Sequence, residues 1–357
     1  MRIKSLRAAL LLAGTVLIAG CGSDSVINRI RVLVAVGFDR EGEMCTGVVA
    51  YPNYIHRKGS LAIMKGSGRE PKLIMEQFQR QSPRKIRYNK VDSIILSRQI
   101  ASEGVTVAVN SIERDPALGS NVLLAVSSCS AESIIRSLDR QELENTPFNL
   151  VRQNVSDGAV PLSNLYFFLH DFYSEGKDPS MPSLALDKQN QIFIDGYALF
   201  KKDRLKLVLN LEEMALFKML QGKPKIEQLF TYKGEHYVLT VRHGRTRSVP
   251  HPGTSPKSMR YDVRLTGSIR NYKGNLLARL PDESRAFAEA IESQIKNKLL
   301  ALLKKMQAGK LDSLGVGERF RSVERDWQAA AFYREDYPTM DFQVNVVVNI
   351  TNSGAGE

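Results

Sequence analysis

The chain has 357 residues, of which 50 are lysine or arginine and 38 are acidic, giving a formal net charge of +12. This length is enough for two or three domains that each bury a core. An excess of basic residues is typical of proteins that bind nucleic acid. The densest basic cluster here, residues 242–247, is however short and has no interleaved aromatic residues. The composition therefore argues against a nucleic-acid-binding protein. It leaves two explanations of the charge open: scattered solvated side chains, or a surface near an anionic membrane.

The first 21 residues have the organisation of a lipoprotein signal peptide. A positively charged start is followed by an apolar stretch of about a dozen residues, whereas a transmembrane helix needs about 20. The stretch ends in L-I-A-G-C at residues 17–21, a lipobox, in which small residues precede the cysteine that is acylated. We expect residues 1–20 to be removed and Cys21 to carry the lipid anchor. The alternative is a secreted protein with a chance cysteine at this position. Export also speaks against a nucleic-acid partner.

Hydrophobic patterning predicts alternating strands and helices along the rest of the chain. Strands are expected at residues 30–36, 45–51, 93–96, 121–126, 191–199, 205–209, 237–242, 261–265, 268–270 and 342–350. Helices are expected at residues 71–81, 131–138, 162–175, 211–221 and 282–308. The segment 178–182 contains proline and serine and is expected to be a connector.

Several helix ends carry sequence signals. Ser130 is expected to cap the helix that follows it. Asn210 and Glu213 have the spacing of a capping box, in which each side chain accepts a hydrogen bond from the other residue's backbone. The longest helix has apolar residues three or four positions apart, with Asp282 as its expected cap and Gly309 at its end.

This order of elements predicts an α+β fold with mixed and antiparallel sheets, packed helices and a long helix near the C-terminus. We expect three domains after the signal peptide. The first is an α/β domain with its tether over residues 21–185. A hairpin and a helix over residues 186–230 form the second, and residues 231–357 form an α+β domain.

The sequence nominates no catalytic residue, cofactor site or metal site. His243 and His251 share a Gly- and Pro-rich stretch, which we expect to be a solvated loop without other ligands at metal-binding spacing. Gly66-Ser67-Gly68 lacks the remaining residues of a P-loop or a dinucleotide fingerprint and is expected to be a flexible turn. Glu212 and Glu213 are expected to favour the start of their helix through the helix dipole. We therefore do not expect an enzyme.

Two cysteines follow the anchor position. Cys45 and Cys129 both lie in apolar segments, and we expect two buried free thiols. A Cys45–Cys129 disulfide is the alternative, because spacing alone does not decide the pairing.

Several short motifs follow one another in an order that is specific as a set. They are A-V-G-F-D at 35–39, S-R-Q-I-A-S-E-G at 97–104, E-R-D-P at 113–116, D-G-Y-A-L-F-K-K-D at 195–203 and D-S-L-G-V-G at 312–317, followed by Trp327 and Gly354. In these motifs the chain resembles the Ger(x)C family of spore germination lipoproteins, the C subunits of nutrient germinant receptors in spore-forming bacteria. Members often have Trp-Asp after the lipidated cysteine, whereas this chain has G-S-D-S at 22–25.

The resemblance implies a non-enzymatic, three-domain subunit that is anchored through Cys21 on the outer face of the spore inner membrane. It also implies assembly with multi-pass A and B subunits and a requirement in nutrient-triggered germination. A lipid-tethered solute-binding protein, which captures a germinant or nutrient itself, is the alternative and needs a pocket with convergent polar groups. A cell-envelope hydrolase is a third possibility and needs a clustered catalytic constellation.

Overall fold

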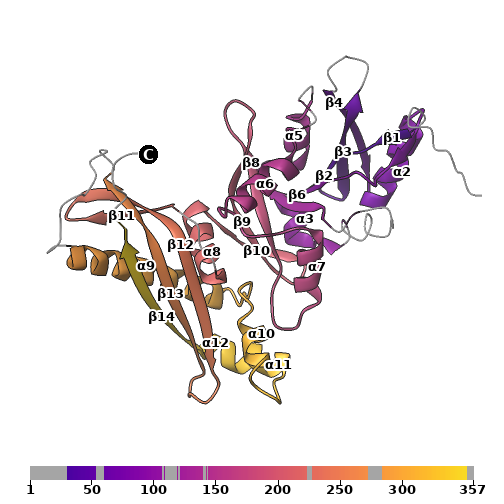
Figure 1. Ribbon diagram of the computed structural model, residues 1–357. Helices are drawn as coiled ribbons and strands as arrows, with labels where there is room; N and C mark the ends of the chain where they lie inside the picture. The colour runs from indigo at the N-terminus through magenta and orange to yellow at the C-terminus, as the bar shows by residue number, and fades with distance from the viewer. Residues whose placement is uncertain are drawn as a thin grey trace, which may run out of the picture.

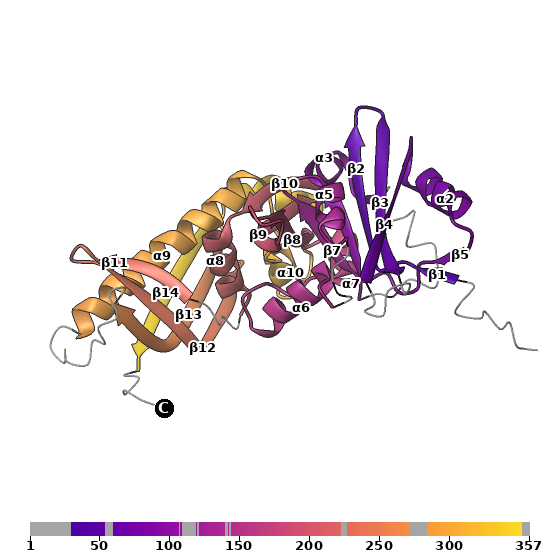
Figure 2. The ribbon, with the colours of Figure 1, turned by 90° about the horizontal axis from the view of Figure 1, so that it is seen from above.

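The computed structural model describes residues 30–53, 60–106, 121–139, 144–222, 227–271 and 284–351, together with positions 108, 119 and 142. Cys21, the motif at 113–116 and the expected cap Asp282 lie outside these residues. The molecule is elongated, with a large sheet towards one end and a small sheet towards the other (Figures 1 and 2). Of the described helices, none combines the length and the apolar character needed to cross a membrane.

The large sheet has eight strands. In spatial order they are β10 (Arg204–Leu209), β9 (Ile192–Lys201), β8 (Ser180–Leu186), β7 (Leu123–Ser127), β6 (Ser93–Ser97), β2 (Ala35–Glu41), β3 (Met44–Asn53) and β4 (Ser60–Gly68). The central strands β8, β7, β6 and β2 run parallel, and the outer pairs run antiparallel. Every residue of β6 and β7 is buried, as expected for parallel strands that are covered on both faces. A separate parallel pair joins β1 (Ile30–Val32) and β5 (Lys85–Arg87).

Side chains of the large sheet alternate between two apolar cores. The helices around it are α2 (Pro71–Gln81), α3 (Arg98–Glu103), α5 (Ala131–Arg136), α6 (Pro147–Ser156) and α7 (Leu165–Tyr173). On one face, Ile94 belongs to a cluster with residues of α2, α3 and α7. On the other face, its neighbour Ile95 packs with α5 and α6. This part of the chain is therefore a three-layer arrangement of helices, sheet and helices.

The small sheet has four strands and one long helix across it. In spatial order the strands are β11 (Glu227–Tyr232), β12 (Glu235–His251), β13 (Ser258–Asn271) and β14 (Asp341–Ile350). The helix α9 (Ser284–Ala308) packs on β14 and shares a core with the strands. Alternate residues of β14 are buried, which confirms the half-buried strand predicted from its pattern.

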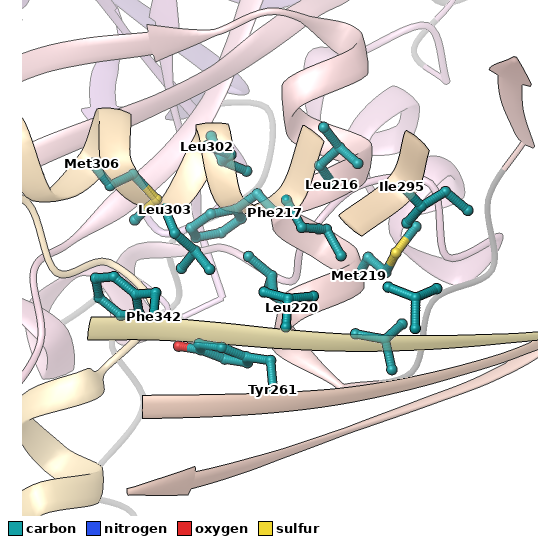
Figure 3. Packing of buried hydrophobic residues seen from close by; sticks show 14 of the residues in the cluster. Leu216, Phe217, Met219, Leu220, Tyr261, Ile295, Leu302, Leu303, Met306 and Phe342 are labelled. Atoms are coloured by element: carbon teal, nitrogen blue, oxygen red, sulfur yellow. The ribbon is translucent and has the colours of Figure 1, made fainter. Parts of the chain in front are cut away.

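A helix between the two sheets joins their cores. In Figure 3, Phe217 and Leu220 of α8 (Leu211–Gln221) lie between α9 and the strands that carry Tyr261 and Phe342. The same cluster includes Leu209 at the end of β10. Burial of apolar surface contributes about 25 cal/mol per Å² to stability. Because this cluster is continuous, its burial stabilises the contact between the two sheets as well as each sheet.

Most predicted elements are confirmed, including α2 at its predicted bounds and the caps at Ser130 and Asn210. The α+β fold and the long C-terminal helix are confirmed as well. The predicted loop at 243–251 is wrong, because β12 continues to His251 after a bulge and stays paired with β13. The predicted turn at 66–68 is also wrong, since these residues pair with β3. Finally, β8 begins inside the predicted connector at 178–182.

The segment 186–230 is shared between the two parts of the fold. Its strands β9 and β10 complete the large sheet, whereas its helix α8 packs on α9 and β12. Strands on both sides of residue 186 therefore belong to one sheet. The division into three domains stays a prediction.

Candidate functional site

Two loops meet between the large and small sheets and form the joint, which we define as residues 174–179 and 309–318 with Lys201 and Tyr333. The first loop follows α7, and the second leads from α9 into α10 (Val316–Arg321). Asp178 N–H donates to the carbonyl oxygen of Asp312 at 2.9 Å, and Asp312 N–H donates to Asp178 Oδ2 at 2.7 Å. These reciprocal bonds join residues that are 134 positions apart in the sequence.

The carboxylate of Asp312 is completely buried at the centre of the joint. Its Oδ1 accepts from Val316 N–H at 2.7 Å, and its Oδ2 accepts from Gly317 N–H at 2.7 Å and from the Tyr333 hydroxyl at 2.8 Å. Burial raises the pKa of Asp312 to about 7, although these hydrogen bonds favour the charged form. The group thus ties the loop at 309–318 to the segment that carries Tyr333.

A lysine from the large sheet completes the joint. Lys201 Nζ lies 3.0 Å from Asp178 Oδ2 and 4.7 Å from the ring centroid of Tyr333. Burial raises the pKa of Asp178, and the charge of Lys201 acts in the opposite direction. The ammonium group therefore offsets a buried carboxylate and contacts an aromatic face at the same time.

Glycine is required where the two loops approach each other most closely. A Cβ atom on Gly317 would lie 2.5 Å from the Tyr333 hydroxyl and 3.1 Å from Gly176 Cα. A Cβ atom on Gly176 would lie 2.6 Å from the backbone nitrogen of Glu318, which donates to the Gly176 carbonyl oxygen at 3.0 Å. The joint is therefore packed too tightly for any side chain at these two positions.

Two of the motifs that suggested a family meet in the joint. The motif at 195–203 supplies Lys201 to the joint, and the motif at 312–317 supplies Asp312 and its hydrogen-bond donors. The turn residue Asp203 accepts hydrogen bonds from Val105 N–H at 2.9 Å and from the Thr106 hydroxyl at 2.6 Å, directly after the motif at 97–104. The motifs thus mark close contacts between distant segments.

The first motif has a separate role at the start of α5. The carboxylate of Asp39 accepts from Ala131 N–H at 2.7 Å and from Glu132 N–H at 2.6 Å. Together with the Ser130 cap, it satisfies backbone donors that the helix itself leaves free. Burial raises the pKa of Asp39, whereas these backbone hydrogen bonds act against the rise.

The other residues singled out from the sequence do not gather into a site. Cys45 and Cys129 are both free thiols, so they form no disulfide. Cys45 is buried as expected, whereas Cys129 is exposed, and the prediction of a buried thiol is wrong for Cys129. Glu212 and Glu213 lie in the first turn of α8 and form ion pairs of 2.6 Å each with lysines of α9. Within the described ranges, no three His, Cys, Asp or Glu side chains are grouped as metal ligands.

Sequence reasoning missed Asp178 and Tyr333, and it treated Asp312 only as part of a motif. A possible signal was the acidic residue flanked by apolar residues and glycines at 311–317, a context that suits a buried carboxylate at a close backbone contact. The physical role of the joint is to fix the small sheet relative to the large one.

Comparison with known proteins gives matches over nearly the whole chain. Residues 23–186 match the family model described as "Spore germination protein N-terminal domain", and residues 195–354 match the one described as "Spore germination B3/ GerAC like, C-terminal". Spore germination protein GerQC of Bacillus cereus is 22% identical over 360 residues, covering 98% of this chain and 99% of that protein. Spore germination protein KC of Bacillus subtilis (strain 168) is 20% identical, covering 98% and 96%.

A solved structure has the same fold. The crystal structure of the GerBC protein superposes with a TM-score of 0.61 at 12% identity and covers 89% of this chain and 97% of that chain. Because the two family models together span residues 23–186 and 195–354, the chain belongs to the GerAC-like family of spore germination proteins.

Proposed function

We propose that this chain is a lipid-anchored, non-enzymatic subunit of a spore germinant receptor that is required for nutrient-triggered germination. The observation that carries the proposal is the end-to-end match to spore germination proteins, which includes the segments that build the joint. In this proposal the anchor on Cys21 holds the chain on the outer face of the spore inner membrane. Multi-pass A and B subunits are its partners there.

The joint supports a scaffolding role. It fixes the two sheets through buried hydrogen bonds and close glycine contacts, and the charged groups of Asp178, Asp312 and Lys201 are hydrogen-bonded or paired within it. A rigid elongated body can present surfaces at both ends to membrane partners in a constant geometry. Function by assembly needs this rigidity and no chemical step.

The anchor is tested with Cys21→Ala in sporulating cells. We expect the variant to move from the membrane fraction to the soluble fraction in a high-salt wash, because acyl chains contribute about 0.8 kcal/mol per buried methylene and are not released by salt. Cys129→Ala is the matched control, since Cys129 is an exposed free thiol, and it stays in the membrane fraction. Unchanged retention of Cys21→Ala contradicts the anchor.

Assembly is tested by affinity purification of the chain from detergent-solubilised spore membranes. We expect multi-pass membrane proteins to be recovered in fixed proportion with it, and a deletion strain to lose germination with nutrients but not with a non-nutrient trigger. Recovery of the chain without any membrane protein contradicts receptor assembly.

A groove beside β10 favours the solute-binding alternative. It has a volume of about 490 Å³, within the range of small-molecule pockets, and it is lined by Arg98, Asp195, Lys206 and Asn210 among others. Charged groups of both signs suit a small zwitterion. Calorimetric titration with amino acids and sugars tests this alternative. Saturable heat that is lost in Arg98→Gln supports it, and the absence of heat removes it.

A further inference from the structure

The face of the small sheet opposite α9 carries an unusual concentration of arginine. Along β12 and β13, Val263 is buried in the core and the Thr246 hydroxyl donates to the Met219 carbonyl oxygen of α8 at 2.6 Å. Because side chains alternate along a strand, the neighbouring residues Arg245, Arg247 and Arg264 point to the opposite side. All three are exposed.

We define the arginine face by five residues on this side of the sheet: Arg242, Arg245, Arg247, Arg260 and Arg264. The exposed His243 lies among them. Asp262 is the acidic residue inside the face, and its Oδ2 lies 3.4 Å from Arg260 Nε. Glu227 and Asp341 are exposed near the margins of the sheet. The centre of the face is therefore strongly positive.

The arrangement of these charges works against the stability of the sheet. The register places Arg245 directly opposite Arg264, and like charges in this position destabilise an antiparallel pair. Over the described parts of the chain, Arg242, Arg245, Arg247 and Arg264 form no ion pair. A cluster of exposed, unpaired arginines of this kind suits a partner of opposite charge.

The composition of the face indicates what kind of partner it fits. The outward positions of β14 beside it are Gln343, Asn345, Val347 and Asn349, and no aromatic residue lies among the arginines. Protein interfaces take most of their affinity from large buried anchors such as tryptophan and tyrosine, whereas the apolar residues beside these arginines, Val249 and Val347, are small. A layer of phosphate headgroups needs only an array of cations, and arginine binds phosphate through two parallel hydrogen bonds.

We propose that the arginine face lies against an anionic phospholipid membrane. Each well-placed basic residue contributes about 1 kcal/mol near such a surface, so the array supplies a second membrane contact far along the chain from residue 21. The inference does not depend on the proposed receptor role or on acylation. The face alone would hold an unacylated chain on an anionic membrane at low salt, so the Cys21→Ala fractions are compared after a high-salt wash, which weakens this contact and leaves an acyl anchor in place.

The test uses residues 21–357 with Cys21→Ser, a chain that retains every described helix and strand. Its binding is measured by co-sedimentation with vesicles of phosphatidylcholine alone or of phosphatidylcholine mixed with phosphatidylglycerol. We expect binding to the anionic vesicles only, weakening as salt is raised because screening shortens the range of the interaction.

The decisive variant is Arg245→Gln/Arg247→Gln/Arg264→Gln. We expect it to bind anionic vesicles about 100-fold more weakly, since three basic contacts are lost. The control, Arg285→Gln/Lys296→Gln/Lys304→Gln, removes the same charge from exposed positions of α9 and keeps most of the binding. The thermal midpoint of the first variant is expected to be unchanged or higher, because the Arg245–Arg264 repulsion is relieved.

Three results overturn the proposal. One is equal binding to both kinds of vesicle. Another is an equal loss of binding in the two triple variants, which reports net charge and not the face. The last is that the Arg245→Gln/Arg247→Gln/Arg264→Gln chain still binds anionic vesicles, but no membrane protein co-purifies with it from spore membranes. That result would assign the face to an acidic protein surface.

Discussion

Asp312 is completely buried, and its carboxylate accepts three hydrogen bonds from groups around it. An amide at this position can accept at only one of the two atoms. The donor that loses its acceptor is then a buried backbone N–H or the Tyr333 hydroxyl, and leaving such a group unsatisfied costs about 1–3 kcal/mol.

We therefore expect Asp312→Asn to lower the free energy of unfolding by about 1–3 kcal/mol. The loss depends on pH, because burial holds the pKa of Asp312 at about 7 in the folded chain, against 3.8 as the ordinary value. Between these two pH values the folded state binds more protons at this group than the unfolded state does. Its contribution to stability is therefore largest near pH 4 and falls as the pH rises towards about 7.

Urea unfolding of the natural chain and of Asp312→Asn between pH 4 and pH 8 measures this difference. The gap between the two chains is expected to narrow as the pH rises. Asp326→Asn removes a carboxylate from an exposed position and serves as the control. If the stability difference between the two chains instead widens towards pH 8, the pKa of Asp312 is not raised in the folded state.

At the scale of single elements, α8 connects the cores of the two sheets, so its start is a sensitive position. The Asn210 side chain accepts from Glu213 N–H at 2.9 Å, and Glu213 Oε2 accepts from Asn210 N–H at 3.1 Å. We expect Asn210→Ala to cost about 1 kcal/mol of stability, as measured by chemical unfolding. Asn210→Asp retains the capping oxygen and restores most of the loss. Equal stability of the two variants contradicts a capping role.

Elements could be predicted from the sequence where their signals are local. The helix α2 begins at Pro71 and is followed closely by Pro83, and its buried residues recur at helical spacing. The end of β12 has no such signal, because its outer side chains are mostly basic or polar and its inner ones are small or polar. Only pairing with β13 extends that strand to His251. The strand β8 was obscured by Pro182.

The joint could not be predicted, because it depends on residues that are far apart in the chain. Asp178 and Asp312 each have an ordinary local context, and only the packing of the two sheets brings them together. Resemblance to a family marked the motif at 312–317, but it gave no physical role to Asp178 or Tyr333. Burial of polar groups is a property of the complete fold.

For the whole molecule, the relation between the two sheets depends on the close approach at Gly317. We expect Gly317→Ala to separate the loops, because the new methyl group would lie 2.5 Å from the Tyr333 hydroxyl. Overpacking of this kind costs about 1–3 kcal/mol. The readouts are a lower thermal midpoint and faster proteolysis at the joint.

The control for this experiment is Gly253→Ala. No atom lies within 4 Å of a Cβ built on Gly253, so the same chemical change meets open space. We expect its thermal midpoint and its proteolysis pattern to match those of the natural chain. Identical behaviour of the two alanine variants contradicts the steric role of Gly317.

The position of β14 also determines when the small sheet can fold. This strand is the last described element, yet it runs parallel to β13 and supplies four buried residues to the core. Until residue 350 has been synthesised, β13 pairs only with β12, and α9 lacks the strand on which it packs most extensively. The core of the small sheet therefore stays open on one side until the last described strand has been made, so this part of the fold is completed only at the end of synthesis.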